Sequence, residues 1–147
     1  MKKISLLLGI LFLTTYAGIS QERKVLGYWL TEKGTSQIKI FKATNGKYYG
    51  KIEWLKNDTD KRDIHNPDES LRDNKLLGMQ ILRGFDYNND SQQWENGTIY
   101  DPDSGKTYDC YMWFEDDPNV LKIKGYVLGM RFLGRETTWT REEGLRQ

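Results

Sequence analysis

From residue 25 to the end of the chain, hydrophobic and polar side chains alternate with a period close to two. Turn-forming residues interrupt the alternation about every eight to twelve positions, which is typical of a protein built from many short strands. No long stretch shows the spacing of about 3.6 residues that marks an amphipathic helix. The alternation predicts strands over residues 25–30, 36–42, 48–55, 76–85, 93–100, 106–114, 120–127 and 131–141.

The segment 96–114 shows this pattern most clearly, as two strands folded back on each other across a turn. In the turn, Pro102 fixes φ, the side chain of Asp101 can bond the nearby backbone, and Gly105 tolerates a positive φ. We therefore assign these three residues a structural role. The side chains predicted to share one face of the strand that follows are Tyr108, Cys110, Met112 and Phe114.

The longest break in the alternation is residues 56–75, a stretch rich in charge and turn formers and nearly empty of apolar side chains. Connections of that length in compact domains are often functional. Within it, residues 67–73 are compatible with one short helical turn.

Eight antiparallel strands joined mostly by tight hairpins predict an all-β fold, an up-and-down barrel that leaves no edge strand open. In a closed barrel the first and last strands are neighbours, which brings Gly27 and Trp29 next to Trp139 and Arg141. This arrangement resembles the lipocalin and wider calycin pattern, in which an early Gly-x-Trp lies at the closed end and a late arginine packs over the tryptophan. The resemblance implies a structural contact of Arg141 over Trp29 that plugs one end of the barrel.

Motifs spread over nearly the whole chain after the first twenty residues carry a more specific resemblance. They are Gly27-x-Trp29-x-Thr31, Ser36, Ile38, Ile40 and Phe41, Gly50-Lys51-Ile52-x-Trp54-Leu55, Asp63-x-x-Asn66-Pro67, Gly97-x-Ile99-Tyr100-Asp101-Pro102-x-Ser104-Gly105-Lys106-Thr107-Tyr108, Leu121-Lys122-Ile123-Lys124-Gly125-Tyr126-Val127 and Trp139-Thr140-Arg141. This set resembles the bacterial secreted family called domain of unknown function 2147 (DUF2147). The resemblance implies a small exported calycin-like barrel, and it carries over no established catalytic residues.

The first twenty residues have the layout of a secretory signal peptide, because Lys2 and Lys3 precede an apolar run over 4–13 and then small residues that end at Ser20. The apolar run is too short to span a bilayer. We therefore expect cleavage before Gln21, an exported protein that is periplasmic or extracellular, and one barrel domain over residues 21–147.

The charge of the predicted mature chain is close to zero. Removing Lys2 and Lys3 leaves 20 basic residues against 21 acidic ones, a net charge of −1. Interspersed charges of this kind give no footprint for nucleic acid or for an anionic membrane surface. We expect a monomer that neither binds nucleic acid nor spans a membrane.

The residues that usually carry metal or catalytic chemistry are scarce. The chain has one histidine, His65, and one cysteine, Cys110, too few for an ordinary zinc site. The spacing Asp86-x-Asn88-x-Asp90 begins like a calcium loop, but the required glycine and bidentate glutamate are missing, which favours a polar turn. We expect no cofactor, no metal and no catalytic residues, and the sequence leans away from an enzyme.

Two hypotheses for function remain open. In the first, the barrel binds a small apolar or amphipathic molecule at the end opposite Trp29 and Arg141. In the second, the core is filled and the protein is a non-enzymatic envelope interaction protein, whose outward Tyr49, Tyr111 and Trp113 and the loop over residues 56–75 meet a protein or glycan. The residues predicted to line the ligand site are Ile52, Trp54, Met79, Ile81, Tyr108, Met112 and Phe114.

Overall fold

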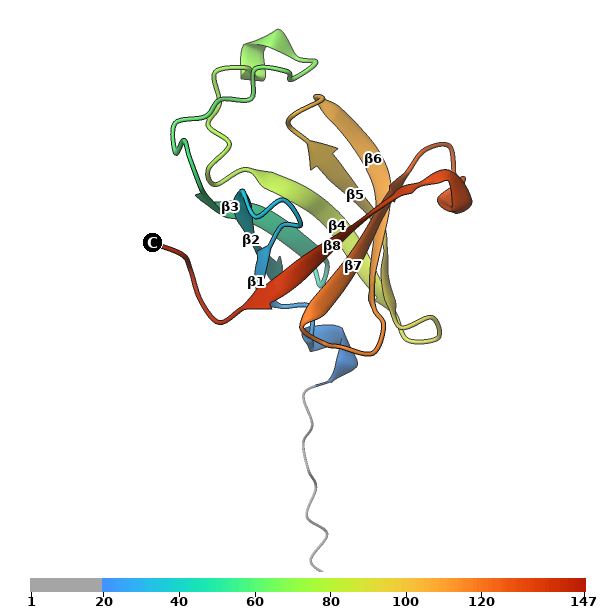
Figure 1. The fold of residues 1–147 in the computed structure, drawn as a ribbon. Helices are drawn as coiled ribbons and strands as arrows, with labels where there is room; N and C mark the ends of the chain where they lie inside the picture. Colours follow the sequence, from blue (N-terminus) through green and yellow to red (C-terminus); the bar gives the residue numbers. More distant parts are fainter. Residues whose placement is uncertain (1–19) are drawn as a thin grey trace, which may run out of the picture.

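The computed structural model describes residues 20–147, so the predicted signal peptide lies outside the described residues except for Ser20. The described chain folds into one barrel of strands (Figure 1). Three short 3-10 helices, η1 (Gln21–Arg23), η2 (Glu69–Leu71) and η3 (Arg131–Leu133), lie outside it. The strands are β1 (Gly27–Leu30), β2 (Ser36–Lys42), β3 (Tyr48–Leu55), β4 (Gln80–Asn88), β5 (Gln93–Asp101), β6 (Lys106–Phe114), β7 (Val120–Tyr126) and β8 (Arg135–Glu142).

The eight strands pair in sequence order, and β1 closes the barrel against β8. All neighbours are antiparallel, as tight hairpins require. At the closing seam Trp29 pairs with Arg141 and Leu30 with Thr140. The predicted closed eight-stranded antiparallel barrel is confirmed.

Two predicted strand starts are wrong by four residues, each because a local turn replaces the first residues of the strand, while β1 begins two residues late and β4 ends three residues late. β4 begins at Gln80 rather than at residue 76, since Gly78 has a φ of 87° and its amide donates to the carbonyl of Ile52 at 2.7 Å. β8 begins at Arg135 because η3 occupies Arg131–Leu133. The helical turn predicted within residues 67–73 is present as η2.

The end of the barrel that carries Trp29 is closed by Arg141. The Arg141 guanidinium carbon lies 4.3 Å from the centroid of the Trp29 ring. The guanidinium also donates to the carbonyls of Leu26, at 3.0 Å, and of Lys24 and Pro118. These bonds join the segment that precedes β1 and the β6–β7 turn to the last strand, and desolvation of the guanidinium lowers the pKa of Arg141.

Gly27 makes room for this contact. A side chain at that position would start 3.4 Å from Nη1 of Arg141, and the φ of Gly27 is 118°, in the region that L-residues avoid. The predicted structural role of Gly27, Trp29 and Arg141 follows from this geometry. Trp139 is 3% exposed and pairs with Leu121 across the β7–β8 ladder.

A register shift in β3 changes which wall Trp54 occupies. Ile38 pairs with Ile52, but Gln37 pairs with Trp54, so Glu53 is an extra residue on the β3 side. Such a bulge breaks the simple alternation of faces. Trp54 therefore shares the outer wall with Gln37 instead of following Ile52 inward, which corrects the prediction that Trp54 lines the interior.

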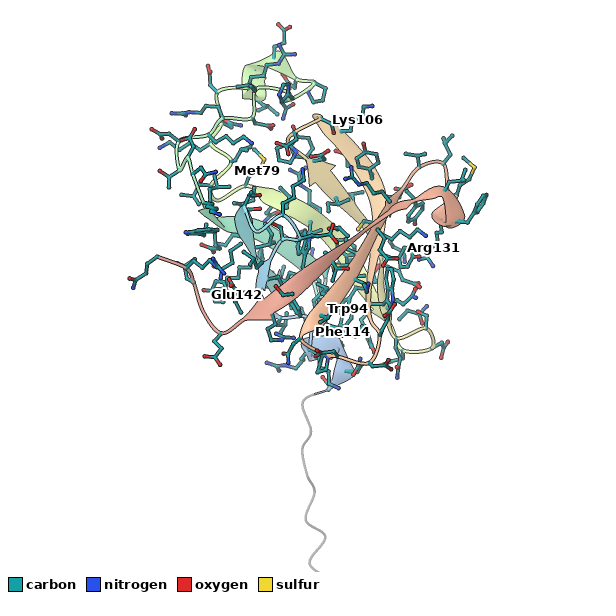
Figure 2. All side chains as sticks on the ribbon, in the orientation of Figure 1. Met79, Trp94, Lys106, Phe114, Arg131 and Glu142 are labelled. Atoms are coloured by element: carbon teal, nitrogen blue, oxygen red, sulfur yellow. The ribbon has the colours of Figure 1, made fainter. Side chains whose placement is uncertain are left out.

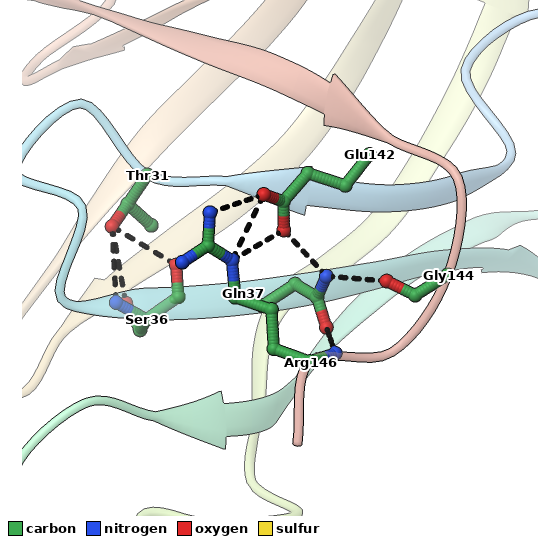
Figure 3. A network of polar contacts seen from close by, with 6 residues as sticks. All are labelled: Thr31, Ser36, Gln37, Glu142, Gly144 and Arg146. Carbon is green, nitrogen blue, oxygen red and sulfur yellow. Dashed lines mark hydrogen bonds and ion pairs between the residues drawn. The ribbon is translucent and has the colours of Figure 1, made fainter.

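The C-terminal tail, residues 143–147, crosses this outer wall (Figure 3). The Gln37 amide donates to Glu142 at 2.6 Å and to the carbonyl of Gly144 at 2.8 Å, and it accepts from the amide of Arg146 at 3.1 Å. The Arg146 guanidinium lies 5.1 Å from the Trp54 ring centroid. These contacts explain why Gln37, a polar residue, has no exposed surface.

Candidate functional site

The connections 31–35, 56–79, 102–105 and 127–134 emerge at the end of the barrel opposite Trp29 and Arg141, because consecutive strands run in opposite directions. We call this end the mouth. Figure 2 shows Met79 and Lys106 at this end and Trp94 and Phe114 at the other. The mouth is the end that the sequence predicted for ligand entry.

The inner wall at the mouth is apolar and only half-buried. Ile99 pairs with Tyr108 across the β5–β6 ladder, and both side chains are partly exposed. Next to them, Gly125 of β7 has no side chain, and a Cβ there would lie 3.4 Å from Cβ of Tyr108 and 3.5 Å from Cγ2 of Ile99. Those separations are ordinary contacts, so Gly125 leaves open wall that a larger residue would fill without strain.

Polar groups ring this apolar wall. The Thr137 hydroxyl of β8 lies 3.3 Å from a carboxylate oxygen of Glu32. On the rim, Asp103 pairs with two lysines, Lys61 at 3.1 Å and Lys33 at 3.6 Å. The hydrogen bond from Lys61, followed by the charges of both lysines, lowers the pKa of Asp103. The rim therefore carries two ammonium groups on one carboxylate, with the carboxylate of Glu32 nearby on the connection that holds Lys33.

The long connection 56–79 is fastened to the β5–β6 hairpin by buried contacts. The Tyr100 hydroxyl donates to Asp63 at 2.6 Å, and the Asn66 amide donates to the other oxygen of that carboxylate at 2.7 Å. At Gly105 the backbone approaches so closely that a Cβ would lie 1.8 Å from the carbonyl oxygen of His65. The predicted structural glycine of the turn therefore also seats the loop against the mouth.

Replacing Tyr100 by phenylalanine should destabilise the fold by about 2 kcal/mol, since it removes a hydrogen bond to a buried carboxylate. Desolvation and the bond to Asp63 raise the pKa of Tyr100 to about 12. The stabilisation is fully present below the unfolded pKa of about 10 and is lost as pH rises through the folded value. Urea denaturation of the two proteins at neutral pH and near pH 12 measures both effects.

Tyr87→Phe is the matched control, because the Tyr87 hydroxyl is buried with no hydrogen-bond partner. It should leave the stability unchanged or raise it. A loss in Tyr87→Phe as large as in Tyr100→Phe, or a difference between wild type and Tyr100→Phe that does not shrink at high pH, would contradict the assignment.

Below the mouth, aromatic side chains fill the closed half of the barrel. The Trp94 ring lies 5.4 Å from Phe114 and 5.0 Å from Tyr87, and Phe114 lies 5.9 Å from Trp29, measured between ring centroids. Among the described residues, the Trp94 indole nitrogen and the Tyr87 hydroxyl are buried side-chain polar atoms without a partner. The closed half is therefore a packed base with two unpaired donors.

A hollow lies outside the barrel, where η1 meets β1 and β2. This depression measures about 430 Å³ and is open to solvent. Glu22 at its edge accepts from Lys42 at 3.3 Å and from Tyr48 at 3.2 Å. Its lining consists of Glu22, Arg23, Leu26, Gly27, Lys39, Ile40, Phe41 and Lys42.

Within residues 20–147, no group of three or more His, Cys, Asp or Glu side chains is arranged to hold a metal ion. Asn88 instead accepts from the amides of Asp90 and Ser91, as a polar turn does. Burial, with a smaller contribution from Asp109, raises the pKa of the Cys110 thiol, and His65 is exposed. The described part of the chain also holds no helix long and apolar enough to cross a membrane.

Comparison with known proteins places the barrel in a family. The model of the family described as "Uncharacterized protein conserved in bacteria (DUF2147)" matches residues 27–141. The chain belongs to the DUF2147 family. The resemblance inferred from the sequence motifs is thus confirmed.

The DUF2147 barrel is similar to a solved structure described as "Protein HP1028 from the human pathogen Helicobacter pylori belongs to the lipocalin family". The two align with a TM-score of 0.69 and 22% sequence identity, over 80% of this chain and 82% of that chain. This likeness confirms a lipocalin-like fold. No curated protein matches the chain.

The residues that the sequence predicted for a ligand site separate into three groups in this DUF2147 barrel. Ile52, Met79 and Tyr108 lie toward the mouth. Met112 and Phe114 belong to the packed closed half, where Met112 pairs with Trp94. In the third group, Trp54 lies on the outer wall, and Ile81 is a buried core residue at an irregularity in the β3–β4 pairing.

Sequence reasoning missed Ile99 and Gly125 at the mouth and Trp94 and Tyr87 at the base. Ile99 could have been predicted as a site residue, because pairing the two strands on either side of the 102–105 turn places it opposite Tyr108. The predicted outward trio is not one cluster either. Tyr111 stacks on Trp113 at 5.1 Å on β6, whereas Tyr49 stacks on Phe41 at 6.0 Å on β3 and β2.

Proposed function

We propose that this DUF2147 protein binds a small amphipathic molecule with an anionic head group at the mouth of the barrel. The observation that carries the proposal is the half-buried apolar wall of Ile99 and Tyr108, with Gly125, which adds no side chain, beside it. An eight-stranded barrel is just wide enough to hold one small ligand. The likeness to a protein described as a lipocalin supports the same function.

The rim specifies the head group. Lys33 and Lys61 are exposed and share the carboxylate of Asp103, so a ligand carboxylate, sulfonate or phosphate would find two accessible ammonium groups there. The apolar part of the ligand would cover Ile99 and Tyr108, which removes apolar surface from water. The proposed ligand class is therefore an anionic amphiphile, such as a fatty acid.

Gly125→Leu tests the site. The purified chain from Gln21 onward should bind anilinonaphthalene sulfonate, an anionic amphipathic dye, with one dye per chain. The leucine should weaken binding by about tenfold or more, because its side chain occupies the apolar wall. Dodecanoic acid should displace the dye at lower concentration than dodecanol, since only the acid carries the anionic head.

Gly144→Leu is the matched control. Gly144 lies on the C-terminal tail, which crosses the outer wall, and a Cβ there would meet no atom within 4 Å. It should bind the dye like the wild type. Equal binding by the two leucine variants would place the dye elsewhere and overturn the proposed site. Equal displacement by the acid and the alcohol would overturn the anionic head group.

Export is the second part of the proposal, and it rests on the signal-peptide pattern of the first twenty residues. Native mass spectrometry of the protein purified from the envelope and medium of producing cells tests both export and ligand binding. The expected mass begins at Gln21 and carries an adduct of lipid-like mass. A full-length chain in the cytoplasmic fraction would contradict export.

A further inference from the structure

The β7–β8 connection, residues 127–134, exposes four large apolar side chains to solvent. Leu128 is 85% exposed, Phe132 78%, Leu133 66% and Val127 48%. Large apolar side chains gathered on one exposed segment mark a site of interaction. In Figure 1 this connection stands clear of the barrel, on the side away from the 56–79 loop.

The backbone holds these side chains outward. Leu128 has a φ of 53°, a conformation that a bulky residue rarely adopts. Arg131 fixes the segment from behind, because its guanidinium carbon lies 4.1 Å from the Tyr111 ring centroid and it pairs with Glu95 at 3.5 Å. The segment is therefore a braced projection, and its tip is a tight turn in which the Met130 amide donates to the carbonyl of Val127 at 3.0 Å.

The chemistry around the projection matches a lipid surface. The segment 124–135 carries three cations, Lys124, Arg131 and Arg135, and no carboxylate of its own, while Arg131 pairs with Glu95 and Glu136 lies opposite Lys124. Tyr111, which Arg131 of this segment covers, stacks on Trp113 at 5.1 Å. The projection thus combines an apolar tip, a basic flank and an aromatic base. In a protein docked on a membrane, such groups face the acyl chains, the phosphates and the membrane interface, respectively.

We propose that residues 127–134 dock the protein on a phospholipid bilayer, with Leu128, Phe132 and Leu133 inserted among the acyl chains. The tip is convex, and a fluid bilayer accommodates a convex apolar projection, whereas a folded partner would need a matching cavity. The connection lies at the mouth end of the barrel, so docking would hold the mouth near lipid. The docking itself does not depend on the ligand proposed above.

Vesicle flotation tests the proposal with the chain from Gln21 onward. The wild type should float with vesicles of phosphatidylcholine and phosphatidylglycerol in equal parts, and more weakly with phosphatidylcholine alone. The double variant Leu128→Ser/Phe132→Ser should lose binding by about tenfold or more, because it removes two apolar side chains from the acyl region. Leu71→Ser/Leu145→Ser, the same change at exposed sites elsewhere, should float like the wild type.

The variants also separate this proposal from its rivals. Wild-type protein that does not float, or the two double variants floating equally, would overturn it. Binding to anionic vesicles alone, abolished by salt and unaffected by Leu128→Ser/Phe132→Ser, would show surface adsorption and overturn insertion. A stable dimer that dissociates only in that variant would assign the projection to a second copy of the chain. Dye binding at the mouth should survive in both double variants, which keeps the two proposals distinguishable.

Discussion

Replacing Arg141 by alanine is expected to destabilise the barrel by about 3 kcal/mol. The substitution removes the cation–π contact to Trp29 and leaves three backbone carbonyls without their charged donor. Those carbonyls belong to the segment before β1 and to the β6–β7 turn. Without these hydrogen bonds, neither the segment before β1 nor the β6–β7 turn is held to the last strand by Arg141.

Urea denaturation followed by tryptophan fluorescence measures this loss. Arg131→Ala is the control, because Arg131 also covers an aromatic ring, Tyr111, but its side chain is 41% exposed and its ion pair lies at the surface. That variant should lose less than about 1 kcal/mol. Similar losses in the two variants would show that Arg141 contributes no more than an ordinary surface arginine.

Gly97→Val is expected to destabilise by about 3 kcal/mol, near the upper end of what overpacking costs. A Cβ on Gly97 would lie 2.4 Å from Cγ of Phe85, inside the ring's van der Waals surface. Phe85 has no exposed surface and cannot move aside without displacing its neighbours. Thermal unfolding should show the loss as a fall in the midpoint temperature.

The matched control for this substitution is Gly125→Val. Both glycines belong to strands and face inward, but a Cβ on Gly125 meets its nearest atom at 3.4 Å. The valine at residue 125 should be tolerated within about 1 kcal/mol. If Gly125→Val destabilised as much as Gly97→Val, the lost stability would come from backbone freedom rather than from the Phe85 ring.

Elements with both alternation and turn chemistry were predictable from the sequence. β2, β3 and β6 begin and end where predicted, because an Asn45-Gly46 turn and the Asp101-Pro102 turn bound strands of regular alternation. The contact of Arg141 over Trp29 was predictable too, since closure makes the first and last strands neighbours. Local patterns decide these features.

Features that depend on tertiary contacts were not predictable in this way. The bulge opposite Gln37 and Ile38 moves Trp54 to the outer wall, and nothing in the local alternation signals one extra residue. The bond between Asp63 and Tyr100 joins residues 37 positions apart, through a loop whose sequence reads as solvated. The prediction of the candidate site residues was the least accurate, because inner and outer faces exchange wherever a strand carries an irregularity.

The pairing of β1 with β8 also determines when the barrel can close during synthesis of the chain. Tyr28, Trp29 and Leu30 pair with the last strand, so the barrel cannot close until β8 has been made. Until then every nascent chain carries two unpaired edges, which invite association with other chains. Premature termination within the last strand should therefore yield aggregates rather than a smaller working protein.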